Sequence, residues 1–146
     1  MRSNLVLAIY LVIGVVDLVM GTIYFTSSQF LAYHSQAIGT PWQDLDTGVQ
    51  AVILAVMRVA GGGWLALGFF TIALAVGVRI SSNTLARWLL PAGTIVFYVP
   101  SFVATWAVYR ETGAQSPWGP SLAMIVIALA ALMIDGPWSS RTQGKR

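Results

Sequence analysis

The sequence predicts an all-α polytopic membrane protein, a four-helix transmembrane bundle with a long outer loop after the first helix. Of the 146 residues, 57% are hydrophobic and only 9% are charged, whereas a soluble domain carries about 25% charged residues. The apolar residues run on continuously, without the polar alternation of barrel strands. A chain of this size could not bury so much apolar surface in water, so its expected solvent is a lipid bilayer.

Four apolar stretches are each long enough to span a membrane as a helix, which takes about 20 residues. They cover approximately residues 4–26, 48–78, 84–109 and 117–134. The second stretch exceeds one span, which indicates a tilt or an extension beyond the bilayer. Asp135-Gly136-Pro137 ends the fourth. Because Asp17 interrupts the first stretch, we expect an uncleaved first helix rather than a signal peptide, and residues 1–146 as a single four-span domain.

The basic residues predict the direction of the helices. With four spans, Arg110 lies on the side of the first and third loops, and six other basic residues lie on the opposite side. Positive residues gather on the cytoplasmic side of membrane proteins, so both termini are expected in the cytoplasm. This placement at helix ends also argues against nucleic acid as a partner, despite the net charge of +3. The six residues are Arg2, Arg79, Arg87, Arg141, Lys145 and Arg146.

Two opposite charges interrupt the first and second apolar stretches. Counted from the outer helix ends, Asp17 lies about 13 Å deep and Arg58 about 15 Å deep. Gly14 and Gly21 share the helix face of Asp17, and Gly61 lies on the face of Arg58. Small residues of this kind let membrane helices approach closely. We therefore predict an ion pair between Asp17 and Arg58 inside the membrane.

The predicted pair has two readings. It is either a salt bridge that sets helix register or a site where Arg58 holds an anionic group and Asp17 is its counter-charge. Tyr98 and Ser101 on the third helix are expected at similar depth. They either hydrogen-bond to the pair or satisfy the carbonyl group that Pro100 leaves free. The candidate ligand-binding residues are Asp17, Arg58, Tyr98 and Ser101.

The run of three glycines at 61–63 also has two readings. Three consecutive glycines permit either close packing of the second helix against a neighbour or a local break in that helix.

The loop at residues 27–47 is long and apolar for a helix connection. The spacing of Phe30 and Tyr33 is compatible with a short helix at the membrane interface. His34, Asp44 and Asp46 are the candidate catalytic residues, as a proton relay or a metal site. Their spacing matches no zinc pattern, so no metal site is predicted, and Asp46 fits better as the cap of the second helix.

Several classes of chemistry have no basis in the sequence. The chain has no cysteine, which excludes disulfides and thiolate chemistry. It also has no phosphate-binding loop, nucleophile elbow or HExxH motif. No cofactor is therefore expected.

His34, Trp42 and Gln50, followed by Met57-Arg58-Val59-Ala60-Gly61-Gly62-Gly63, resemble a family of uncharacterised small four-helix membrane proteins of bacteria. The likeness extends from the first helix into the third. It implies a bacterial inner-membrane protein with four spans, and it brings no established activity.

Three function classes remain. The leading one is a structural or accessory membrane protein, whose partners are the lipid bilayer and either other membrane subunits or further copies of the chain. The alternatives are a transporter or binder of a small anionic or amphipathic ligand at Arg58 and Asp17, and a membrane-embedded enzyme that uses His34.

Overall fold

The computed structural model describes residues 4–81 and 83–138. Four of the helices in these ranges are long and apolar enough to cross a membrane, as the sequence predicts. Their bounds differ from the expected ones by at most three residues, with the largest differences where the second and third long helices end. In chain order the elements are α1 (Asn4–Thr26), α2 (Ala32–Ile38), the 3-10 helix η1 (Trp42–Asp44), α3 (Thr47–Ser81), α4 (Thr84–Thr112) and α5 (Trp118–Asp135).

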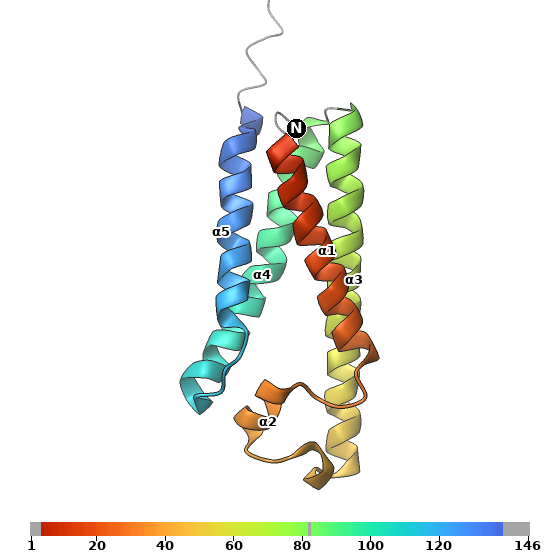
Figure 1. Ribbon diagram of the computed structural model, residues 1–146, viewed down its shortest axis with the longest axis vertical. Coiled ribbons are helices and arrows are strands. Elements are labelled where there is room, and N and C mark those ends of the chain that lie inside the picture. The colour runs from red at the N-terminus through yellow and green to blue at the C-terminus, as the bar shows by residue number, and fades with distance from the viewer. Residues whose placement is uncertain (1–3, 82, 139–146) are drawn as a thin grey trace, which may run out of the picture.

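The long helices form two antiparallel pairs, α1 with α3 and α4 with α5. The two pairs also face each other, because α3 packs against α4 and α1 packs against α5. Figure 1 shows the pairs close together at the end that holds the start of α1, and spread apart at the end that holds α2. The two ends of the bundle therefore differ in how closely the helix pairs approach.

Glycines bring α1 and α3 into backbone contact. Gly21 faces Gly61, and Gly14 faces Gly68, so each helix presents two glycines seven residues apart to the other. A Cβ atom at Gly61 would lie 2.6 Å from the backbone nitrogen of Phe25, too close for any side chain. Small residues allow this approach between membrane helices. Since α3 is continuous through residues 61–63, the expectation of close packing is confirmed and that of a helix break is wrong.

A buried apolar core and an ion pair close the end of the bundle that holds the start of α1. Arg87 Nε donates a hydrogen bond to Asp135 Oδ2 at 2.6 Å, and Nη2 donates to the backbone oxygen of Asp135 at 2.8 Å. Both side chains are buried, so each charge is compensated where water has little access. The core residues are Val6, Tyr10, Ile13, Ala75, Val78, Ala86, Leu90 and Ala131.

The connection between α1 and α3 folds into α2 and η1. The short helix that the sequence predicts is α2, which ends at Gly39 in the left-handed conformation (φ +71°). The Gln36 side chain of α2 accepts a hydrogen bond from the Gln115 backbone, which ties α2 to the connection before α5. At the start of α3, the Gln50 side chain donates to the Trp42 carbonyl at 2.7 Å. These bonds hold the connection against the spread end of the bundle.

Candidate functional site

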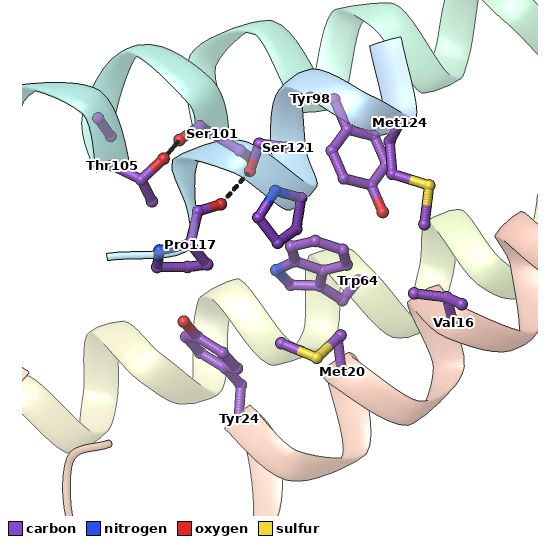
Figure 2. Close-up of a pocket in the computed structure, with 12 residues that line it drawn as sticks. Val16, Met20, Tyr24, Trp64, Tyr98, Ser101, Thr105, Pro117, Ser121 and Met124 are labelled. Atoms are coloured by element: carbon purple, nitrogen blue, oxygen red, sulfur yellow. Dashed lines mark hydrogen bonds between the residues drawn. The ribbon is translucent and has the colours of Figure 1, made fainter. Parts of the chain in front are cut away.

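A cavity of about 280 Å³ lies between the two helix pairs. All four long helices contribute to it, and Figure 2 shows their side chains pointing into the shared space, with the Trp64 ring between α1 and α4. Its lining residues are Val16, Met20 and Tyr24 of α1, Trp64 of α3, Tyr98, Ser101, Ala104 and Thr105 of α4, and Pro117, Pro120, Ser121 and Met124 at the start of α5.

The wall of the cavity is mainly aromatic and apolar. The Trp64 ring meets the Tyr98 ring edge-on, with centroids 5.3 Å apart. The hydroxyls of Ser101, Thr105 and Ser121 donate to backbone carbonyls within three or four residues, so their donors are already used. Within the described ranges, no Asp, Glu, Lys or Arg lines the cavity. The wall can therefore hold an apolar body, with few polar groups to orient it.

The acidic side chain bonded to this wall is that of Asp17. Its side chain is completely buried, and Oδ1 accepts a hydrogen bond of 2.6 Å from the Tyr98 hydroxyl. Among the residues the structure describes, Oδ2 has no hydrogen-bond partner. A buried polar atom without a partner is uncommon and points to a water, an ion or a ligand that completes it. The carboxyl thus adjoins the cavity through Tyr98.

The predicted ion pair between Asp17 and Arg58 does not form. The glycine contacts put Asp17 level with about Leu67 of α3, which leaves Arg58 about nine residues, or about 13 Å, nearer to α2. Arg58 is exposed, and Asp17 bonds to Tyr98 instead. The expectation assumed that α3 begins level with the end of α1. In the structure α3 begins well beyond it, and this offset separates the charges.

The other two candidate ligand residues both lie on the cavity wall. Tyr98 reaches Asp17, as the idea of a shared polar cluster predicts. Ser101 bonds to Phe97 O of its own helix at 2.9 Å, so it belongs to the wall and not to the cluster. Trp64 of α3 was not among the predicted site residues. Its ring packs against that of Phe97, with ring centroids 4.8 Å apart, and its indole also faces the cavity.

His34 lies in an aromatic cluster on α2. Its ring centroid is 3.9 Å from that of Tyr33 and 6.1 Å from that of Phe30. The Leu31 N–H donates to His34 Nδ1 at 3.1 Å, and burial lowers the pKa of His34 below its usual value. The Tyr33 and Tyr24 hydroxyls share a hydrogen bond of 2.8 Å. Because Tyr24 also lines the cavity, this cluster is joined to the cavity wall.

The other two candidate catalytic residues do not join His34. Asp46 Oδ1 accepts a hydrogen bond of 2.7 Å from the Gly48 N–H, which is the helix cap that the sequence predicts. Asp44 is exposed in η1. Within residues 4–81 and 83–138, no ion pair links His34 to either carboxylate, and no group of three His, Asp or Glu residues is placed to hold a metal ion.

Comparisons with protein-family models, with curated proteins and with solved structures find no match to this chain. The resemblance to small bacterial four-helix membrane proteins therefore stays a prediction.

Proposed function

We propose that this protein binds a small, largely apolar or amphipathic molecule inside a membrane, in the cavity between its two helix pairs. The observation that carries the proposal is the wall itself, to which all four long helices bring aromatic, methionine and proline side chains. Small-molecule sites are concave and mainly apolar, and in bundles they lie between helices. A volume of about 280 Å³ suits a molecule of one or two rings.

The membrane is, on this proposal, a bacterial inner membrane, with both termini in the cytoplasm and α2 outside. Arg79 and Arg87 belong to the helix ends that lie with the start of α1, whereas Arg110 belongs to the opposite end of the bundle. Because Arg58 also belongs to the outer side on this proposal, the described basic residues divide two against two, and the orientation rests on the sequence count of six basic residues against two. Four further basic residues used in the sequence argument lie outside the described residues: Arg2, Arg141, Lys145 and Arg146.

In this arrangement Arg58 lies at the membrane interface and not in the ligand site. The 20 residues from 59 to 78 carry no charge, and as a helix they cover about 30 Å, the thickness of the hydrocarbon core. Arg79 and Arg58 then lie at opposite interfaces, where their long side chains reach the headgroups. Residues 47–58 of α3 extend beyond the outer interface and support the connection that carries α2.

Two other functions have weaker support. A structural or accessory role would need a face that marks a partner, but exposed apolar side chains occur on every long helix, as contact with lipid requires. An enzyme built on His34 would need a proton partner. Its Nδ1 already accepts from Leu31, and the two candidate carboxylates lie elsewhere.

Ligand binding is tested with 1-bromo-4-tert-butylbenzene, a neutral probe whose bromine quenches nearby tryptophan fluorescence. In purified protein in neutral maltoside micelles, we expect saturable quenching above the micelle background. Ala104→Phe fills space at the cavity wall and should abolish the saturable part. Ala92→Phe, an exposed alanine of α4 away from the cavity, is the matched control and should bind as wild type does. Equal quenching in all three proteins would refute the proposal.

A further inference from the structure

We infer that the ligand of this cavity is a small lipophilic cation, an aryl-bearing amine or quaternary ammonium, and that Asp17 is its counter-charge. The inference rests on the proposed function, since it names the ligand class of the same cavity. It reverses the sequence-based expectation of an anionic ligand, which relied on Arg58 in the site.

The first argument concerns the negative charge of Asp17, which is not balanced within the site. Asp17 is fully buried, and Tyr98 engages only one of its two oxygens. A carboxylate inside a membrane keeps its charge at a high cost unless a positive charge or hydrogen-bond donors offset it, and it otherwise takes up a proton. Arg58 is exposed about 13 Å away along the helix axis. Arg87 lies near the start of α4 and is bound to Asp135. A cation in the cavity would supply the missing charge.

The second argument is the wall next to that carboxyl. Val16 lines the cavity and directly precedes Asp17, and Tyr98 both lines the cavity and bonds to the carboxyl. Figure 2 shows the Tyr98 hydroxyl pointing from α4 toward α1, beside the Trp64 ring. Tryptophan and tyrosine faces attract ammonium groups, and the attraction strengthens where water is excluded. Tyr24 adds a third aromatic ring at the α2 side.

The third argument is what the cavity lacks for other ligands. None of the Lys or Arg residues that the structure describes lines it, so an anion would meet no positive charge from them and would face the field of Asp17. A neutral molecule without a hydrogen-bond donor would fit the wall but would leave Oδ2 of Asp17 without a partner. Met20 and Met124 add flexible, polarizable surface that adapts to varied apolar groups. The cavity therefore favours a positive charge on an apolar body.

The test uses three probes of nearly equal shape and different charge: 4-bromophenyl-trimethylammonium, the neutral 1-bromo-4-tert-butylbenzene, and 4-bromobenzenesulfonate. Each is titrated into wild-type protein, Asp17→Asn and Ala104→Phe in neutral maltoside micelles, with tryptophan quenching as the readout. We expect saturable binding of the cation to weaken at least about tenfold in Asp17→Asn, while the neutral probe keeps its affinity within about twofold. In wild-type protein, the cation should bind and the sulfonate should not.

The outcomes separate the two proposals. If the neutral probe binds saturably and Asp17→Asn changes cation and neutral probe alike, the cation inference falls and the proposed function stands. If no probe gives saturable quenching, both fall. If Asp17→Asn does not fold, the comparison of cation with sulfonate in wild-type protein decides. Competition by added phosphatidylcholine would identify a lipid headgroup, rather than a free amine, as the source of the ammonium.

Discussion

The hydrogen bond from Tyr98 to Asp17 joins residues 81 positions apart and ties α4 of one helix pair to α1 of the other. Because both side chains are buried, the bond is made where no water competes for it, which strengthens it. The same surroundings make any loss of a partner costly. A polar group that helps to hold two helix pairs together is thus also the group that we propose as the counter-charge of the ligand.

Tyr98→Phe should lower the stability of the folded protein by about 1–3 kcal/mol, because it leaves both oxygens of a buried carboxyl without a donor. Adding Asp17→Val should recover most of the loss, since replacing both partners by apolar groups removes the unsatisfied atoms. Unfolding in detergent by heat or by sodium dodecyl sulfate measures both effects. Tyr109→Phe, at an exposed tyrosine of the same helix, is the control and should change stability by less than about 0.5 kcal/mol.

We expect the stability of the connection between α1 and α3 to depend on pH through His34. Burial holds the pKa of His34 below its usual value, so the folded protein binds its proton less readily than the unfolded chain does. Protonation also removes the acceptor that Nδ1 offers to the Leu31 N–H. Burial and the bond to Tyr24 raise the pKa of neighbouring Tyr33, which stays neutral throughout this range. The stability of α2 is therefore full above about pH 6.5 and falls as the pH drops toward the folded-state pKa of His34.

Hydrogen–deuterium exchange tests this dependence. Protection of residues 31–38, corrected for the intrinsic effect of pH, should decrease between pH 7.5 and pH 5 (roughly the range in which a histidine of lowered pKa titrates). In His34→Asn the side-chain oxygen can still accept from Leu31 but cannot titrate, so protection should stay constant. Equal pH dependence in both proteins would show that another group controls α2.

At the scale of the helices, the sequence predicts where each helix begins and ends, but it does not predict how α1 and α3 are aligned with each other. The helix ends follow from Gly39, from the Asp46 cap and from the limits of the apolar stretches. The offset between α1 and α3 is set by the glycine contacts, and it does not follow from where each helix begins or ends. Counting depth from each helix end therefore misplaced Arg58. The glycines themselves were a better guide to alignment than the two charges were.

The three consecutive glycines of α3 offer a sharp test, because they have different surroundings. A Cβ atom at Gly61 would meet backbone of α1 at 2.6 Å, whereas one at Gly62 would meet nothing within 4 Å. Gly61→Ala should therefore cost about 1–3 kcal/mol through overpacking. Gly62→Ala should be neutral or stabilise α3 by up to about 1 kcal/mol. Thermal unfolding of the two variants in the same detergent compares them, and equal effects would rule out the α1–α3 contact described here.

At the scale of the molecule, the class of fold could be predicted because composition and hydropathy suffice for it, as four helices able to cross a membrane confirm. The cavity could not be predicted from the sequence, because it depends on how far the two helix pairs spread at one end. The ion pair of Arg87 and Asp135 was missed although a signal existed. Opposite charges lie at the adjoining ends of two consecutive antiparallel helices. The prediction was based on the charges in the middle of apolar stretches, and it therefore paired Asp17 with Arg58 instead.

The orientation of the bundle can be measured directly, because the chain contains no cysteine and any introduced one is a unique label. Gln43 in η1 and Ser81 at the end of α3 are exposed and lie at opposite ends of the bundle. In intact bacterial cells, a membrane-impermeant maleimide should label Gln43→Cys, and should label Ser81→Cys only after the membrane is opened. Arg58→Cys should react from the same side as Gln43→Cys, since about 30 Å of apolar helix separates it from Arg79.

Each departure from that pattern has its own meaning. Labelling of Ser81→Cys alone in intact cells would invert the orientation and leave the cavity between the helix pairs as it is. Labelling of Gln43→Cys and Ser81→Cys from the same side would mean that α3 does not cross the membrane, which would remove the basis for a ligand site within the bilayer. If Gln43→Cys reacts in intact cells and Arg58→Cys reacts from neither side, Arg58 lies deeper than its place at the interface requires. The 20 uncharged residues from 59 to 78 would then not mark the part of α3 that crosses the hydrocarbon.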